Sequence, residues 1–186
     1  MSETSILGAE LSPLLTRLAA DETGGLEMEI RFGEIHKGKR AYFQTGVSLN
    51  WLMAVKAYLE RSGWILISDI KYQQFKVGQK RVRIFADGKT EAISKRVIAM
   101  RDVMLPKAKD VRISLAREKA VDIPSLTGVK HKRVYRQTYM LDGFRFDLTK
   151  TKHPRGKLWE NRVEVEVVDG LQANLRQIIE TVAAIS

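Results

Sequence analysis

Along most of the chain, apolar and polar residues alternate with a period of two. This is the spacing of β-strands, because successive side chains of a strand point to opposite faces. The alternation predicts eight strands, and Asp87-Gly88 and Asp142-Gly143 predict hairpin turns between neighbouring ones. The expected strands are Leu26–Phe32, Gly63–Asp69, Arg81–Ala86, Glu91–Ala99, Asp110–Ala116, Lys130–Leu141, Phe144–Thr151 and Arg162–Val168.

Three other segments carry apolar residues at helical spacing. The first is expected to begin at Ser12, because serine is a favoured N-cap residue and Pro13 suits the first helical position. Eight short strands with three helices predict an α+β fold around a curved or closed antiparallel sheet. The predicted helices span residues 12–20, Ser48–Arg61 and Asp169–Ala184.

The polar positions of the predicted strands are mostly charged. Acids are concentrated on two strands, at Glu27 and Glu29 and at Glu164 and Glu166, whereas other strands carry mainly basic residues. One interpretation is an ordinary sheet with its core on one side and water on the other. The alternative is a barrel with the charged face inside and the helices over its apolar outer face. Solvent-exposed faces usually mix both signs across strands, so the separation of signs favours the barrel.

The composition limits the class of protein. A chain of 186 residues with 44% hydrophobic residues fits one domain, expected over residues 1–186. The absence of cysteine excludes disulfides, thiolate metal sites and a cysteine nucleophile. There is no apolar run long enough for a bilayer, and the N-terminus lacks the basic region of a signal peptide. We therefore expect a protein of the cytoplasm, the nucleus or a virus, neither secreted nor bound to a membrane.

The formal net charge of +10 fits either a polyanionic partner or a solubilising basic surface. The paired Glu-x-Glu strands favour the first. Clustered carboxylates resist ionising together unless a cation neutralises them, and carboxylate ligands without His or Cys suit Mg²⁺ or Mn²⁺. Arginine and lysine on the remaining walls would bind phosphates. Together these groups indicate metal-dependent phosphoryl transfer without a covalent nucleophile.

Four strand motifs occur in the chain: Leu26-Glu27-Met28-Glu29-Ile30-Arg31-Phe32-Gly33, Val111-Arg112-Ile113-Ser114 followed by Glu118, Phe144-Arg145-Phe146-Asp147-Leu148-Thr149, and Val163-Glu164-Val165-Glu166. In this order they resemble those of the metal-dependent RNA 5′-triphosphatases of the triphosphate-tunnel superfamily, which begin mRNA capping in fungi, protists and large DNA viruses. The resemblance implies a closed eight-stranded antiparallel β-barrel with a charged lumen and a few outer helices. It also implies hydrolysis of the γ-phosphate of 5′-triphosphate RNA, leaving a diphosphate end for a guanylyltransferase acting in trans.

The same resemblance assigns roles to individual residues. Mg²⁺ or Mn²⁺ would be held by glutamates of the first and last strands, and Glu118 would orient the attacking water. The implied metal ligands are Glu27, Glu29, Glu164 and Glu166; the implied catalytic residues are Arg112, Glu118, Arg145 and Asp147; the implied phosphate-binding residues are Arg31, Arg83, Lys95, Arg112, Arg133, Arg145 and Thr149.

Two of these assignments have an alternative. The last strand has two alternating glutamates where the family usually has three, so the ligand is either Glu164 or Glu166. In the strand that begins at Lys130, the two lysines Lys130 and Lys132 have opposite parity to Arg133. Inward-facing Arg133 is preferred, because the apolar Val134 would then join the outer face.

Two other functions remain open. The same fold could act on a small triphosphate such as thiamine triphosphate or tripolyphosphate, although Arg31, rather than a lysine, at the third charged position favours the RNA-capping branch. The chain could also be a basic RNA-binding module that needs no metal. The basic segment 150–157 is either a solvated loop or part of a path that leads RNA to the tunnel.

Overall fold

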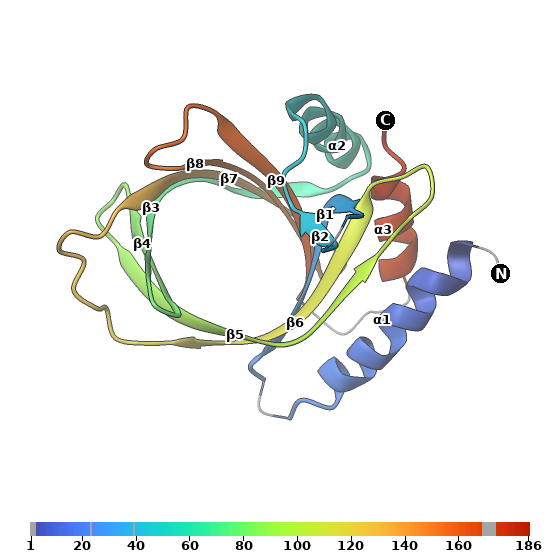
Figure 1. The fold of residues 1–186 in the computed structure, drawn as a ribbon, viewed down its shortest axis with the longest axis horizontal. Coiled ribbons are helices and arrows are strands. Elements are labelled where there is room, and N and C mark those ends of the chain that lie inside the picture. Colours follow the sequence, from blue (N-terminus) through green and yellow to red (C-terminus); the bar gives the residue numbers. More distant parts are fainter. Residues whose placement is uncertain (1–2, 23, 39, 169–173) are drawn as a thin grey trace.

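The computed structural model describes residues 3–22, 24–38, 40–168 and 174–186. Eight antiparallel strands close into a barrel, as predicted, in the order β1-β6-β5-β4-β3-β7-β8-β9 with β9 returning to β1 (Figure 1). A ninth strand, β2, pairs only with the outer end of β1. The strands are β1 (Leu26–His36), β2 (Tyr42–Gln44), β3 (Ile65–Val77), β4 (Lys80–Phe85), β5 (Thr90–Val103), β6 (Asp110–Ala120), β7 (His131–Leu141), β8 (Phe144–Lys152) and β9 (Trp159–Val167).

Both predicted hairpin turns are confirmed. Asp142 and Gly143 have φ angles of 46° and 79° between β7 and β8, the left-handed geometry of tight two-residue hairpins. Gly88 has a φ of 83° in the turn from β4 to β5. These turns set the register of two hairpins, and the register decides which side chains face the inside of the barrel.

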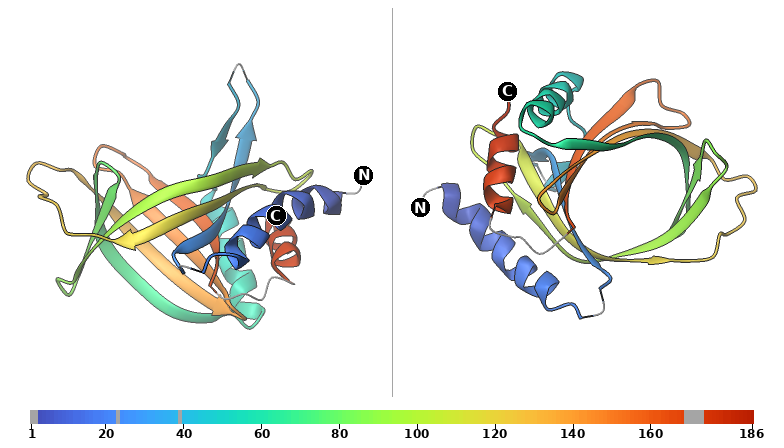
Figure 2. Two further views of the ribbon diagram at one scale, coloured as in Figure 1. Left: turned by 90° about the horizontal axis from the view of Figure 1, so that it is seen from below. Right: turned by 180° about the vertical axis from the view of Figure 1, so that it is seen from behind.

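The hairpin from β1 to β2 was not predicted and projects beyond the barrel (Figure 2). It depends on Gly33, because a Cβ atom there would lie 2.1 Å from the carbonyl oxygen of Gln44. Any other residue at position 33 would push β2 away from β1.

The three helices lie outside the barrel on one side of it (Figures 1 and 2). They are α1 (Glu3–Ala19), α2 (Leu49–Arg61) and α3 (Leu175–Ala183). The predicted helix Ser48–Arg61 is confirmed as α2, and Ser48 is its N-cap, since the backbone N–H of Trp51 donates to Oγ of Ser48 at 3.1 Å. The first five residues of the predicted third helix, 169–173, lie outside the described residues.

The predicted start of α1 at Ser12 is wrong, because the helix begins at Glu3 and contains Pro13. Leu7, Leu11 and Leu14 form one buried stripe along this helix. Burial of that stripe outweighs the hydrogen bond that Pro13 removes from the helix. Tertiary packing has therefore overridden the local signal.

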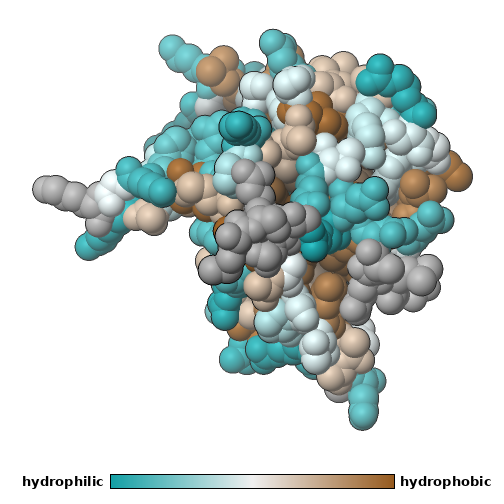
Figure 3. Space-filling model, turned by 90° about the vertical axis from the view of Figure 1, so that its right-hand side faces the viewer, coloured by the Kyte–Doolittle hydropathy of each residue, from teal (hydrophilic) through white to brown (hydrophobic). Residues whose placement is uncertain are grey.

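The hydrophobic core lies between the helices and the barrel wall. Met28, Ile30 and Phe32 of β1 are fully buried and belong to one cluster with the apolar stripes of the helices. Trp64 packs edge-on against Phe146 of β8, with ring centroids 4.8 Å apart. Seen from the side where the helices lie, hydrophilic and hydrophobic residues are interspersed over the surface (Figure 3). The strands of the barrel wall thus turn their apolar faces to the helices. Their opposite faces carry polar side chains inside the barrel.

Within the described residues, none of the helices is both long enough and apolar enough to span a bilayer.

Candidate active site

The barrel encloses a cavity of about 360 Å³ to which all eight barrel strands contribute side chains. Every predicted site residue except Arg112 and Arg133 lines it. Those that do are Glu27, Glu29, Arg31, Arg83, Lys95, Glu118, Arg145, Asp147, Thr149, Glu164 and Glu166. The lining also includes Tyr72, Gln74, Lys76, Arg81, Lys132, Val134, Arg136, Thr151 and Arg162, which were not predicted as site residues.

Strand register brings the acidic motifs together. Glu29 of β1 lies directly opposite Glu166 of β9, and Arg31 lies opposite Glu164. On the other side of β9, Arg145 of β8 is opposite Glu166. Directly opposed residues share a face of the sheet with their Cβ atoms about 5 Å apart, so the two Glu-x-Glu motifs form one group inside the barrel.

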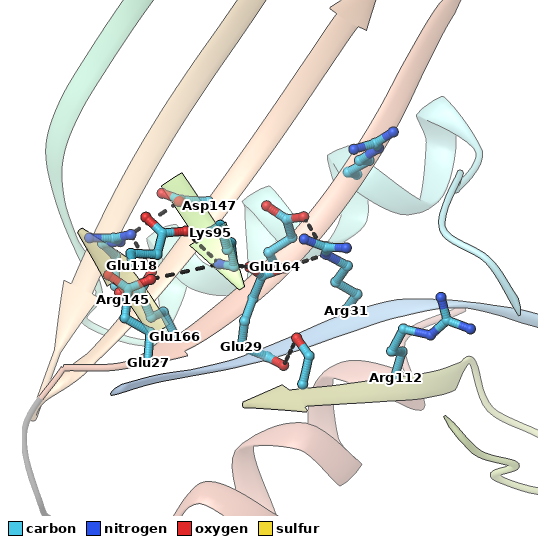
Figure 4. A network of polar contacts seen from close by, with 12 residues as sticks. Glu27, Glu29, Arg31, Lys95, Arg112, Glu118, Arg145, Asp147, Glu164 and Glu166 are labelled. Atoms are coloured by element: carbon cyan, nitrogen blue, oxygen red, sulfur yellow. Dashed lines mark hydrogen bonds and ion pairs between the residues drawn. The ribbon is translucent and has the colours of Figure 1, made fainter. Parts of the chain in front are cut away.

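Lys95 of β5 neutralises the glutamates at the β1–β6 wall (Figure 4). Its Nζ lies 2.7 Å from Glu118, 3.0 Å from Glu29 and 3.6 Å from Glu27, and its side chain is 8% exposed. Burial alone would lower the pKa of Lys95, but Glu29 and Glu118 outweigh it and raise that pKa. One buried ammonium group therefore serves three carboxylates.

The negative charge near β9 is incompletely neutralised. Burial raises the pKa of Glu166 to about 7, although Arg145 forms an ion pair with it. The pKa of Glu27 is also raised, first by burial and then by the nearby carboxylate of Glu118. This part of the cavity therefore favours an additional cation.

Glu164 and Glu166 have different surroundings. Arg31 Nε donates to Oε1 of Glu164 at 2.8 Å. Burial opposes ionisation of Glu164, yet Arg31 and Arg136 hold its pKa well below the ordinary value. The charge of Glu164 is thus balanced by two arginines. Glu166 instead lies directly opposite another carboxylate, that of Glu29, across the strand pair.

Five side-chain donors of cavity-lining residues are buried and have no hydrogen-bond partner within the described part of the chain. They are Tyr72 OH, Arg83 Nε, Arg136 Nε, Arg145 Nε and Thr149 Oγ1, and all five residues line the cavity. A buried donor left unpaired costs about 1–3 kcal/mol, so this concentration of unpaired donors fits a ligand rich in anionic oxygens.

Arg136 and Asp147 form a pair in the cavity wall. Arg136 Nη1 lies 3.2 Å from Asp147 Oδ2, and the hydroxyl of Thr138 donates to Oδ1 of Asp147 at 2.7 Å. Burial would lower the pKa of Arg136, but Asp147 outweighs it and raises that pKa above the ordinary arginine value. Asp147 thus fixes the orientation of a cation that the sequence analysis did not identify.

The preference for an inward-facing Arg133 is wrong. Across the Asp142-Gly143 turn, Thr149 pairs with Arg136, so an inward Thr149 places Arg136 and Lys132 in the lumen and Arg133 outside. Arg133 instead lines an outer groove at one end of the barrel. Counting residues outward from the turn would have revealed this parity. The apolar character of Val134 was the misleading signal, because Val134 lines the lumen.

Arg112 also lies outside the cavity, in contrast to its predicted place in the tunnel. It is the register partner of Arg31 and so has the same parity, but its side chain lies apart from the group around Glu164 and Lys95 (Figure 4). Arg112 Nε and Nη2 donate to Asp102 at 2.7 and 2.8 Å, and the guanidinium lies 4.8 Å from the ring centre of Phe43. The ring belongs to Phe43 of the unpredicted strand β2. Its contact with Arg112, together with the Asp102 ion pair, keeps the guanidinium out of the cavity.

The carboxylates fit a hard divalent cation by their chemistry and register. No group of three or more acidic, histidine or cysteine side chains in the described residues is arranged around a metal as the side chains stand, because each carboxylate turns to a lysine or arginine. However, Glu29 and Glu166 face each other directly, Glu27 is on the same face of β1, and the pKa of Glu166 is raised. All-oxygen donors of this kind suit Mg²⁺ or Mn²⁺.

The antiparallel barrel thus forms a tunnel with unpaired cationic donors and grouped carboxylates in its lumen. The family described as "mRNA capping enzyme, beta chain" matches residues 66–184. The chain therefore belongs to this family. The match does not include β1, which carries Glu27 and Glu29. The position of these two glutamates in the cavity therefore comes from the structure and not from the family match.

Solved structures share the fold at low sequence identity. One of S. pombe Pct1 RNA triphosphatase in complex with the Spt5 CTD has a TM-score of 0.76 and 16% identity, covering 100% of this chain and 95% of that one. Another of S. pombe Pct1 has a TM-score of 0.72 and 18% identity, covering 97% and 84%. The RNA triphosphatase domain of a trifunctional mimivirus mRNA capping enzyme has a TM-score of 0.60 and 14% identity, covering 100% and 98%. No curated protein sequence matches the chain.

Proposed function

We propose that this protein is a metal-dependent RNA 5′-triphosphatase that removes the γ-phosphate from triphosphate-ended RNA, the first step of mRNA capping. The observation that carries the proposal is the cavity itself, where five unpaired buried donors face the same space as a group of glutamates. Family membership and the likeness to proteins described as RNA triphosphatases support it.

The phosphate chain lies between the basic walls of β4, β7 and β8. Arg83 and Arg136 flank the ring of Tyr72, each with its guanidinium carbon 5.8 Å from the ring centre, so the three residues form one rigid surface. Arg145 approaches from β8. Their unpaired N–H groups bind the oxygens of the triphosphate and stabilise the charge that spreads over the γ-phosphate in the transition state.

Glu27, Glu29 and Glu166 would hold Mg²⁺ or Mn²⁺. When bound, the ion polarises the γ-phosphate and neutralises its charge. Glu164 acts differently from Glu166: it holds Arg31, which also forms an ion pair with Glu29 and so positions that ligand. Asp147 orients Arg136 in the same way from the opposite wall.

Glu118 orients the attacking water, while Lys95 links it to Glu29. The water oxygen bonds to the γ-phosphorus as the bond from that phosphorus to its bridging oxygen breaks, and the water proton passes to the Glu118 carboxylate. The products are inorganic phosphate and a 5′-diphosphate RNA, which a guanylyltransferase acting in trans then uses. Because the substrate is nascent RNA, the protein works where RNA is made. This is the nucleus or, for a viral protein, the cytoplasm of the host cell or the virus particle.

Phosphate release from γ-labelled triphosphate RNA tests this proposal. We expect release with Mg²⁺ or Mn²⁺, none with chelator, and a loss of at least about 10³-fold in Glu29→Gln. Glu34→Gln is the matched control, because Glu34 is an exposed residue of the same strand. Full activity in a folded Glu29→Gln would reject the metal assignment. Release from tripolyphosphate or nucleotides but not from RNA would identify a small-molecule triphosphatase, and metal-independent RNA binding without hydrolysis would indicate a binding module.

A further inference from the structure

The lumen is polarised along its axis. Because neighbouring strands are antiparallel, the end of one lies beside the start of the next. Lys76 near the end of β3, Arg81 near the start of β4, Lys132 near the start of β7 and Arg162 near the start of β9 therefore lie at one mouth. All four line the cavity. We call these four residues the basic collar.

The other end of the lumen is acidic. Glu27 at the start of β1, Glu118 near the end of β6 and Glu166 near the end of β9 lie there, with Arg145 at the start of β8. The proposed metal ligands and the water-orienting glutamate are thus on the side away from the basic collar. A phosphate chain bound across both regions has a defined direction.

The basic collar has little negative charge of its own. Lys76, Arg81 and Lys132 form no ion pair within the described residues, and Arg162 pairs with Glu160 at 2.8 Å. Burial lowers the pKa of Lys132, and the neighbouring Arg162 lowers it further. Four cations held together with one neighbouring carboxylate, Glu160, indicate a place for an anion.

At Lys132 and Arg162 the collar lies beyond the reach of a triphosphate held at the carboxylates. Lys132 is four residues from Arg136 along β7, and Arg162 is four residues from Glu166 along β9. At about 3.3 Å per residue each interval is about 13 Å. The phosphorus atoms of a triphosphate are joined by single bridging oxygens and span less than this, so the collar needs a longer polyanion.

Basic residues continue outside the same mouth. A groove between the start of β7 and the loop that joins β8 to β9 is lined by Lys130, Arg133, Lys152 and Arg155 together with His131 and His153, and no carboxylate lines it. Arg133 and Lys152 are register partners on the outer face of the sheet. A nucleic-acid strand that leaves the lumen past Lys132 would enter this groove next.

We propose that the basic collar binds the first phosphodiesters of the RNA, so that the RNA body leaves the barrel at this mouth and runs into the outer groove. The inference rests on the proposed function and deepens it: the collar distinguishes RNA from nucleotides, which have no phosphodiester to place there. Segment 150–157 is accordingly part of the RNA path rather than a solvated loop.

The test compares kcat/KM for a nucleoside triphosphate, a triphosphate dinucleotide and a triphosphate decamer. The variants are Lys132→Ala, Lys76→Ala and the control Lys119→Ala, an exposed β6 lysine beside Glu118 on the opposite face. In the wild type kcat/KM rises with chain length. Each collar variant lowers it about tenfold for the decamer, leaves the nucleotide within about twofold, and reduces the salt slope of decamer binding by about one.

Two results would overturn the inference while the proposed function stands. Equal losses on nucleotide and decamer would make the collar part of the triphosphate site, and unchanged decamer kinetics would mean that the RNA leaves elsewhere. Failure of the proposed function looks different, since the wild type would then release γ-phosphate from neither of the triphosphate RNAs, whether or not it hydrolysed the nucleotide. Fluorescence anisotropy of a labelled decamer in chelator tests the collar independently of turnover, and equal affinity of wild type and Lys132→Ala would reject it.

Discussion

Replacing Lys95 with methionine tests the electrostatic account of the cavity. Methionine keeps much of the buried chain but removes the positive charge that lies within 3.6 Å of Glu27, Glu29 and Glu118. Removing one partner of a buried ion pair costs about 3–5 kcal/mol. In a chain of this size 1 kcal/mol corresponds to about 2–4 °C, so we expect the metal-free melting temperature to fall by about 10 °C at pH 8.

The same substitution should increase the response to metal. The carboxylates left without Lys95 bind Mg²⁺ or Mn²⁺ more tightly, and a ligand at one hundred times its Kd adds about 2.7 kcal/mol of stability. Thermal melts at pH 8 measure both effects. One series is recorded in chelator and the other over a metal titration that reaches saturation. The matched control is Lys119→Met, which removes an exposed lysine on the opposite face of β6. A fall of less than about 3 °C in chelator, or a metal-induced rise no larger than in the wild type, would refute the reasoning.

Three further predictions concern single residues. Glu118→Gln should lower kcat by about 10²–10⁴-fold with little change in the affinity for RNA, because it removes a general base but no phosphate contact; single-turnover kinetics and binding measure the two. Arg136→Lys keeps a positive charge beside Asp147 but loses the planar guanidinium group, so kcat/KM should fall by about 10²–10³-fold. An unchanged kcat/KM would show that Arg136 is not part of the active site. Since the pKa of Glu166 is raised to about 7, its bound proton stabilises the metal-free protein below that pH and is lost as the pH rises. Calorimetry should therefore show tighter Mg²⁺ binding at pH 8 than at pH 6 with release of a proton, and Glu166→Gln should abolish that difference.

The alternation of residues was sufficient to predict the barrel strands. Glu27 and Glu29 alternate with apolar residues, as do Glu164 and Glu166, and this periodicity shows that the two glutamates of each strand share one face. The two hairpin turns were predictable because Asp-Gly allows the left-handed backbone that they require. The sequence therefore contained the fold and the acidic side of the cavity.

Strand ends and long-range contacts were less predictable. Strand β3 continues to Val77 although its second half is polar, because Tyr72 and Gln74 face the lumen and the backbone pairs with two neighbours. Arg112 has the correct parity but is captured by Asp102 and Phe43, a contact that depends on β2. Such pairings join residues far apart in the sequence, which periodicity cannot show.

Arg136 shows how much a register adds to a pattern. Its strand has cations at both parities, so alternation alone leaves the inward set undecided. The Asp142-Gly143 turn resolves this, because it pairs Arg136 with Thr149 and so places both in the lumen. Combining turn chemistry with an assigned neighbouring strand would have identified this arginine from the sequence.

The central claim is tested most directly by identifying the products from one RNA labelled separately at its α- and γ-phosphates. The account predicts that wild-type protein with Mg²⁺ or Mn²⁺ releases the γ-label as inorganic phosphate, keeps the α-label on a diphosphate-ended RNA, and does neither in chelator. Release of pyrophosphate, or equal hydrolysis with and without divalent metal, would contradict it.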